Sequence, residues 1–425
     1  MKHSVINMTT QPIELVFPAA GVVRRIANAA GFGDGPTPTP WAVNVRLEDT
    51  LTKRLRGGSF EGLEVEDIPL DNPRFFEDSD GNNITDDSGN TLYFDGERSV
   101  AGSGGRLLAI PGPDAPDEHP AEVIYRGRLL RPDGAAIFAS RQGDYADWDY
   151  GADVDDQGRA FVIQLSEAGE IGGDVVALVP HKDAYLLAAT SDSLWVVSGD
   201  PTANGMMRNV SRGVGMVAAR AWCKDHMDRV YFLSSHGLYT VGADGQGLQA
   251  VSEGAIPVEL TGIENEDTVL AYNHADRGVY IHLPGDTLSF FFDTERQGFW
   301  PFTLDSSDSH VLFGPVKLGS IDQNGVINSI HGMVAAGSAA VTWRIITGET
   351  AEEAADNGKA AIAASLSSSS FSNYVKYSGS WTAGRSLTVR PRVRGMWACI
   401  WLQSAGQWAF ERMTMQIASA GAWRD

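Results

Sequence analysis

Three segments of the sequence repeat one pattern, starting at His181, His226 and His274, which lie 45 and 48 residues apart. Each copy begins with His-x-Asp, continues through an apolar run, a polar turn and a second aromatic run, and ends in an acidic turn. The copies span residues 181–200, 226–244 and 274–293, and a weaker copy spans residues 125–144. A period of about 40–50 residues with about four strands per unit is typical of propeller blades. The repeat therefore predicts an all-β protein.

A four-stranded blade has two apolar faces, and it can cover both only when it packs between neighbouring blades. We therefore expect residues 41–425 to form a β-propeller of six or seven blades, closed by strands from both chain ends. This closure would bring residues 51–63 next to the final residues. The aromatic side chains of Trp195, Tyr239 and residues 290–292 are expected to pack between blades.

Two segments differ in composition from the expected blades. Residues 1–40 are interpreted as an extended N-terminal arm, because residues 31–40 read GFGDGPTPTP, which favours extended backbone. Residues 348–373 form a less regular insertion or connection, in which an Ala/Glu portion predicts one short helix and a serine run predicts an exposed connection.

Charge restricts the classes of partner. The 425 residues include 33 basic and 54 acidic side chains, which gives a net charge of −21 at pH 7. Such a field repels phosphate backbones and anionic lipids, so it argues against groove-binding to DNA and against membrane attachment. It agrees with the wall of a channel along which DNA slides without binding. No apolar stretch approaches the ~20 residues of a membrane-spanning helix, and the first residues do not resemble a secretion signal.

Two cysteines, Cys223 and Cys399, are the only ones in the chain. They are too few for a disulfide framework or a cysteine-based zinc site. Both have apolar neighbours, and free cysteine behaves as a small buried hydrophobic residue. The sequence therefore predicts two buried free thiols.

The repeated His-x-Asp pairs are candidate metal ligands or candidate turn residues. Zinc requires three or four ligands at one point, whereas these pairs occupy equivalent places in successive blades. Asp and His side chains readily satisfy the backbone of a turn, so turn capping is the favoured interpretation. The pairs are His181/Asp183, His226/Asp228 and His274/Asp276.

An acidic stretch at Glu77-Asp78-Ser79-Asp80-Gly81-Asn82 resembles the start of a calcium-binding loop. No Glu stands at the twelfth position of that loop, where the bidentate ligand is required. With Asp86-Asp87-Ser88-Gly89-Asn90, this stretch is better interpreted as two polar hairpin turns.

Residues 143–150, GDYADWDY, alternate carboxylates with aromatic rings. The pattern suits a carbohydrate cleft, in which Asp147 and Asp149 would be the acid/base candidates. It also suits a strand whose aromatic side chains face inward while its aspartates face solvent, and this interpretation is favoured.

Residues 213–218, GVGMVA, match a loose dinucleotide-binding pattern, but no strand–helix unit surrounds them, so the match is attributed to chance. No nucleophile elbow, phosphate-binding loop or zinc-protease motif occurs, and the blade turns lack the Asp-box pattern Ser-x-Asp-x-Gly-x-x-Trp. We therefore assign no catalytic, cofactor-binding or metal-binding residue and no cofactor, and we expect no enzymatic activity.

Several motifs, in order along the chain, resemble those of podovirus tail hub or nozzle proteins, which include packaged-DNA stabilisation proteins and tail tubular protein B. The resemblance covers about residues 41–425. This chain is much shorter than tail tubular B proteins, and residues 348–373 have no clear counterpart in them. The motifs are NVR at 44–46 with RLRGGS at 54–59, ASRQGDYADWD at 139–149, DSLWVVSGDP at 192–201, VYFLSSHGLY at 230–239, and WAFER at 408–412 followed by Gly421 and Arg424.

The resemblance implies a structural virion protein, made in the host cytoplasm and located in the phage tail. It implies a ring of copies, usually a hexamer, below the head–tail adaptor protein. The ring would extend and seal the DNA channel, allow genomic DNA to pass without sequence-specific binding, and attach a tail fibre, spike or needle. Two alternatives stay open: a β-propeller enzyme that acts on glycans, and a receptor-binding module that works through its blade loops.

Overall fold

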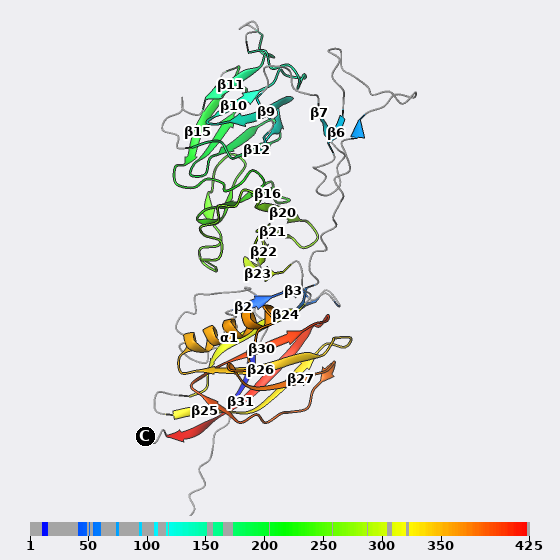
Figure 1. The fold of residues 1–425 in the computed structure, drawn as a ribbon, viewed down its shortest axis with the longest axis vertical. Coiled ribbons are helices and arrows are strands. Elements are labelled where there is room, and N and C mark those ends of the chain that lie inside the picture. The colour runs from blue at the N-terminus through cyan, green and yellow to red at the C-terminus, as the bar shows by residue number, and fades with distance from the viewer. Residues whose placement is uncertain are drawn as a thin grey trace, which may run out of the picture. The chain divides into compact units, whose positions relative to one another are not determined.

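The computed structural model describes residues 11–15, 41–48, 51, 54–60, 74–75, 93–95, 106–108, 116–117, 119–150, 156–164, 173–203, 205–256, 258–286, 288–303, 308–319 and 323–422. These residues form strands and a single helix, so the expected all-β class is confirmed (Figure 1). The chain divides into two compact units. The first unit contains Met1–Glu64, Glu253–Val258 and Asn273–Asp425, and the second contains Val65–Ser252 and Glu259–Tyr272.

Three four-stranded antiparallel sheets make up most of the second unit. In each sheet, strands that follow one another along the chain are hydrogen-bonded neighbours, as in a propeller blade. We use the word blade as a name for these three sheets; the first contains β8 (Val123–Tyr125), β9 (Arg128–Asp133), β10 (Ala136–Ala139) and β11 (Phe161–Gln164). The second contains β12 (Ala177–His181), β13 (Tyr185–Ala189), β14 (Leu194–Ser198) and β15 (Met206–Ser211). The third contains β16 (Trp222–Lys224), β17 (Val230–Ser234), β18 (Gly237–Val241) and β19 (Gln249–Ala250).

The second unit also contains β20 (Val269–Asn273) and a small sheet of β5 (Arg74–Phe75), β6 (Tyr93–Asp95) and β7 (Arg106–Leu108). The predicted repeat agrees with the blades, because residues 181–200 contain β13 and β14 and residues 226–244 contain β17 and β18. The weaker copy at 125–144 contains the hairpin of β9 and β10.

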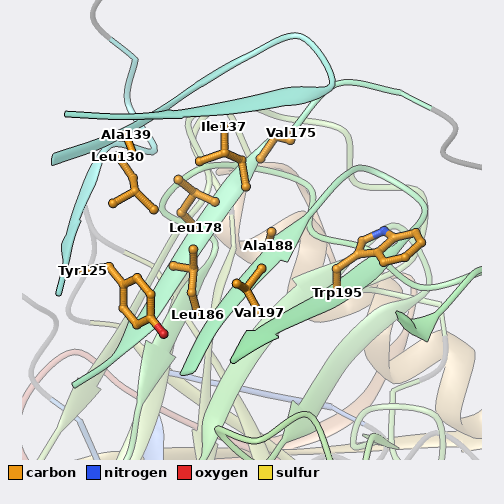
Figure 2. Close-up of a cluster of buried hydrophobic side chains, with 10 residues drawn as sticks. All are labelled: Tyr125, Leu130, Ile137, Ala139, Val175, Leu178, Leu186, Ala188, Trp195 and Val197. Carbon is orange, nitrogen blue, oxygen red and sulfur yellow. The ribbon is translucent and has the colours of Figure 1, made fainter. Parts of the chain in front are cut away.

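Apolar side chains fill the space between the first and second blades (Figure 2). Leu130 and Ile137 from the first blade point toward Leu178 and Leu186 from the second (Figure 2). Trp195 is 1% exposed and belongs to this cluster, so its expected place between blades is confirmed. Burial of this apolar surface stabilises both sheets at once, which neither blade achieves alone.

A second cluster joins the second blade to the third. The opposite side of the second blade contributes Leu187 and Val196, which pack with Val230 and Phe232 of the third blade. Tyr239 packs against the same cluster, as the sequence predicted. The second blade is therefore covered on both faces. This explains why the central strands β13 and β14 are apolar at almost every position.

The first unit contains longer strands in two five-stranded sheets. One has the order β2 (Trp41–Val43), β24 (Ser309–Lys317), β30 (Trp397–Ser404), β26 (Val341–Gly348), β27 (Val375–Trp381). The other has the order β1 (Gln11–Leu15), β31 (Phe410–Ala422), β25 (Gln323–Val334), β28 (Gly384–Arg385), and β29 (Val393–Gly395) also pairs with β25. The hairpin of β3 (Val45–Glu48) and β4 (Leu55–Ser59) and the strands β21 (Gly278–His282), β22 (Ser289–Asp293) and β23 (Gly298–Phe302) complete this unit.

The helix α1 (Ala351–Leu366) lies within the 348–373 segment, so the predicted short helix is confirmed. Thr350 caps its N-terminus by accepting a hydrogen bond from the Glu353 amide, and Glu353 accepts one in return from the Glu349 amide. The helix lies against β24, β26 and β30 (Figure 1), and its buried residues Ala354, Ala361 and Ile362 pack with Leu312 and Trp401. The serine run that follows, at 367–370, is exposed as expected.

The two ends of the described chain meet in the first unit. Gly58 forms an antiparallel bridge with Ala409, and the Ser59 amide donates to the Trp408 carbonyl at 3.0 Å. Arg56 and Glu411 form an ion pair beside this bridge. The expectation that residues 51–63 lie next to the final residues is thereby confirmed for residues 56–59. β1, inside the expected N-terminal arm, pairs along its whole length with β31, whereas residues 31–40 lie outside the described part of the chain.

Candidate functional site

The His-x-Asp repeats form turns between the first two strands of their sheets. Lys182, Asp228 and Arg277 in these turns have φ of 48°, 62° and 50°, the left-handed conformation that closes tight hairpins. The turns lie where the sequence predicted them, but the side chains that cap them are not the predicted His and Asp. In the third blade, Asp225 accepts hydrogen bonds from the amides of Met227 and Arg229, so the residue before the His is the cap. Asn273 does the same for Ala275.

The aspartates of the repeat contact other groups instead. In the second unit, Asp183 accepts a hydrogen bond from the Arg126 amide of the first blade at 3.1 Å. Asp228 lies 3.5 Å from the Lys182 ammonium of the second blade. In the first unit, Asp276 accepts a hydrogen bond of 2.5 Å from the Tyr280 hydroxyl. The first two contacts link neighbouring turns of the second unit, and we call the residues 125–127, 181–184 and 224–228 the turn row.

Two further contacts extend the turn row. The Lys224 ammonium donates to the Pro180 carbonyl, and it lies 5.6 Å from the Trp222 ring centre. Burial lowers the pKa of Lys224, and the nearby Asp228 partly offsets that effect. His226 stacks on Tyr272, and a hydrogen bond of 3.0 Å joins His226 Nδ1 to the Tyr272 hydroxyl. Each blade thus contributes paired charges or hydrogen bonds that fix its position against the next.

Metal chemistry has no candidate centre in the described residues. Within them, no group of three or more His, Cys, Asp or Glu side chains converges in a way that would hold a metal ion. The acidic stretches at 77–82 and 86–90 lie outside the described residues. Cys223 and Cys399 are buried free thiols, as predicted, and burial raises the pKa of both. A raised pKa keeps each thiol protonated and therefore weakly nucleophilic.

The acidic aromatic segment at 143–150 is a loop, and the prediction of a strand is wrong. Asp144 accepts a hydrogen bond from the Ala146 amide, and Asp147 accepts one from the Asp149 amide. Each of these local bonds turns the chain and removes a donor that a strand ladder would need. The burial pattern agrees in part with the prediction, since Trp148 is 2% exposed whereas Asp144 and Asp149 face solvent.

Two arginines of β9 are buried in the first blade, and one of them, Arg131, contacts this loop. Arg128 is buried and donates to the carbonyl oxygens of Ser140, Gln157, Gly158 and Arg159 at 2.5–2.9 Å. Its burial lowers its pKa. Arg131 forms a buried ion pair with Glu122 at 2.9 Å, and its guanidinium lies 5.6 Å from the Trp148 ring centre. The sequence analysis did not single out either arginine. The strand sequence RLLRPD does not show which distant carbonyl, carboxylate or aromatic groups a buried arginine will contact.

Residues 213–218 lie in the connection between β15 and β16 of two antiparallel sheets, which agrees with attributing their dinucleotide-like pattern to chance. Gly215 passes close to the turn at Thr190, whose carbonyl accepts a hydrogen bond from the Met216 amide at 2.9 Å. A Cβ at Gly215 would lie 2.0 Å from that carbonyl oxygen. The glycine therefore serves a close backbone approach.

The NVR motif at 44–46 is buried in the first unit. Asn44 has φ of 54° and its side chain bonds both the amide and the hydroxyl of Thr303. Arg46 is 7% exposed and lies among the rings of Phe60, Tyr280, Phe291 and Phe302, and it donates to the Trp300 carbonyl at 3.3 Å. Burial lowers the pKa of Arg46 to about 10. The motif therefore connects β2 and β3 to β23.

No family model and no curated protein matches the chain. Among the described residues, no helix combines the length and the apolar character needed to cross a bilayer. The described geometry offers charge pairing and aromatic enclosure that hold strands and loops together.

Proposed function

We propose that this chain is a structural subunit of the tail hub or nozzle of a short-tailed phage. The observation that carries the proposal is the meeting of the first and last motifs that resemble this family. Residues 56–59 of the first motif contact residues 408–411 of the last through the Gly58–Ala409 bridge and the Arg56–Glu411 ion pair. Such a closure joins both chain ends into one body, which suits a protein that bears load.

The sheet arrangement supports a propeller-like body for this role. Six sheets of four or five strands are present in the described residues, and three four-stranded ones follow one another along the chain. Closure of the sheets into a propeller of six or seven blades is part of the proposal. The remaining motifs support a structural role too, because Asn44, Arg46 and Trp148 are all buried.

Charge supports the proposed relation to DNA. A net charge of −21 on each copy would give a ring whose wall repels the phosphate backbone, so that genomic DNA passes without sequence-specific binding. In this proposal the ring contains several copies, by the resemblance six, below the head–tail adaptor, and it attaches a fibre, spike or needle. The place of the protein would be the virion tail.

The proposal includes no enzymatic activity and no cofactor. The glycan-acting alternative relied on the run at 143–150, where an exposed ring would stack on a sugar. Trp148 is buried under Arg131 and so is not available for such stacking. We therefore do not extend the proposal to hydrolysis.

The test combines purified protein with tail particles assembled without it. Negative-stain imaging and mass measurement should show the added chain bound at the distal end of the adaptor as a ring. A chain that folds and never joins the particles would contradict the proposal. Phage particles that lack the chain should lose packaged DNA faster than complete particles do, which a nuclease-protection assay measures.

A further inference from the structure

Charges are segregated along this chain. Residues 357–410 contain six basic residues and no Asp or Glu, although the whole protein has a net charge of −21. Residues 230–276 show the opposite composition, with seven acidic residues and no Lys or Arg. Because the two segments carry opposite charges, one segment of one copy can attract the other segment of a second copy.

The basic segment includes one border of the sheet that contains β25. Residues 384–395 run antiparallel along β25, through β28, a bridge between Val389 and Ile330, and β29. We call these residues the arginine edge. It contains four arginines, all exposed: Arg385, Arg390, Arg392 and Arg394.

The arginines of this edge lack acidic partners. In the described part of the chain no carboxylate forms an ion pair with any of the four, and only Arg385 donates a hydrogen bond to a side chain, at 3.3 Å to His331 Nε2. Leu387 lies between them and is 89% exposed. Arginine is enriched at protein interfaces, and an apolar side chain at the centre of a charged strip suits a protein partner.

A sheet border needs protection from other strands, and charged residues or proline provide it. Arg390, Pro391 and Arg392 fit that role. Edge protection does not explain Leu387, because an exposed apolar side chain invites association. A nucleic acid offers this leucine little apolar surface, and the field of the whole chain repels phosphates. A protein with an acidic surface is therefore the favoured partner.

We propose that the arginine edge of one copy docks on an acidic loop of a second copy, at residues 261–267. In that loop Glu264, Glu266 and Asp267 are exposed. The contact is heterologous, since one copy offers the edge and the other offers the loop. This docking rests on the proposed function, which requires several copies to assemble. It deepens that function by naming the two surfaces that meet.

Two variants test the two surfaces separately. The edge variant is Arg390→Gln/Arg392→Gln/Arg394→Gln, and the loop variant is Glu264→Gln/Glu266→Gln/Asp267→Asn. The full chain should form species larger than its monomer mass of 45.7 kDa in sedimentation velocity. Each variant alone should self-associate more weakly by on the order of tenfold or more. Arg212→Gln/Arg220→Gln, which alters exposed arginines elsewhere, should associate like the wild type.

Mixing the two variants gives the decisive measurement. The intact edge of the loop variant can dock on the intact loop of the edge variant, so an equimolar mixture should form pairs that do not extend further. Pairing also shows that both variants are folded. Raising salt from about 0.15 M to about 1 M shortens the Debye length from ~8 Å to ~3 Å and should weaken the pairing.

Several outcomes would overturn the docking. These are a wild type that stays monomeric at all concentrations, variants that associate normally, and a mixture that forms no pairs. Loss of binding to short duplex DNA by the edge variant, with self-association unchanged, would assign the edge to nucleic acid instead. If the wild type joins tail particles while the edge variant associates normally, the docking fails and the proposed function stands. If copies dock as described but never join particles, the docking stands and the proposed function fails.

Discussion

The guanidinium of Arg46 lies 3.8 Å from the centre of the Phe291 ring. No carboxylate pairs with this buried cation among the described residues, and its Nη2 has no hydrogen-bond partner there. Aromatic rings enclose the cation and attract it to their faces, and the nearby carboxylates of Asp276 and Asp293 also favour its charged form. Arg46 could stabilise the first unit through its charge or through the volume that it fills among the rings.

Substitution of Arg46 separates the two contributions. Arg46→Ala is expected to lower the free energy of unfolding by about 2–4 kcal/mol, because it leaves a cavity among four rings. Arg46→Met is expected to cost less than about 1.5 kcal/mol, because a well-packed hydrophobic side chain often replaces a buried charge without loss. Urea unfolding measures both. If Met costs as much as Ala, the cation–ring attraction rather than volume stabilises this site.

Acid should destabilise the first unit through His310. This side chain is fully buried, its Nδ1 accepts a hydrogen bond from Trp401 Nε1 at 3.2 Å, and its Nε2 has no partner among the described residues. Burial, with a smaller effect of Arg344, lowers the pKa of His310 to about 4. Below the ordinary pKa of ~6.5 the unfolded chain binds a proton that the folded chain refuses, so stability falls as the pH drops from about 6.5 to 4.

The loss attributable to His310 should reach about 3 kcal/mol near pH 4, at about 1.4 kcal/mol for each pKa unit. Urea unfolding between pH 7.5 and 4.5 measures it as the difference between wild type and His310→Gln, which should depend less on pH. His236→Gln, at an exposed histidine, is the control and should keep the wild-type dependence. Equal pH dependence in all three proteins would contradict the assignment.

Two glycines of the 213–218 segment should respond differently to the same change. Gly215→Ala is expected to cost about 2–4 kcal/mol, because its Cβ would meet the Thr190 backbone at 2.0 Å. Gly213→Ala should change stability by less than about 1 kcal/mol, because a Cβ there has no atom within 4 Å. Thermal unfolding of both variants checks the comparison. Similar stabilities would show that the backbone at Gly215 moves easily.

Arg128→Lys should loosen the segment around residues 156–160. Arg128 bonds four carbonyl oxygens from two of its nitrogens, whereas a lysine ammonium reaches fewer of them from one point. The expected loss is about 2–3 kcal/mol, since hydrogen bonds from a charged donor are the stronger ones. Hydrogen exchange should show faster exchange at residues 156–160. Arg212→Lys, at an exposed arginine, should leave these amides unchanged.

The sequence by itself determined the local units of this protein. The His-x-Asp period predicted the hairpins, because a two-strand unit with a tight turn is encoded by neighbouring residues. The Ala/Glu run predicted α1, and the apolar neighbours of Cys223 and Cys399 predicted their burial. The contact of residues 56–59 with residues 408–411 agrees with the expectation that residues 51–63 lie next to the final residues.

Tertiary structure decided the rest. Residues 143–150 alternate like a strand, yet in the fold they form a loop whose Trp148 is buried against Arg131 of β9. The order β1-β31-β25-β28 pairs β1 with β31 from the opposite end of the described chain, and local sequence does not specify such pairing. The enclosure of Arg46 by rings from β21–β23 and the alignment of residues 384–395 on β25 exist only once distant segments meet. Strand partners and buried cations depend on long-range packing, which periodicity does not encode.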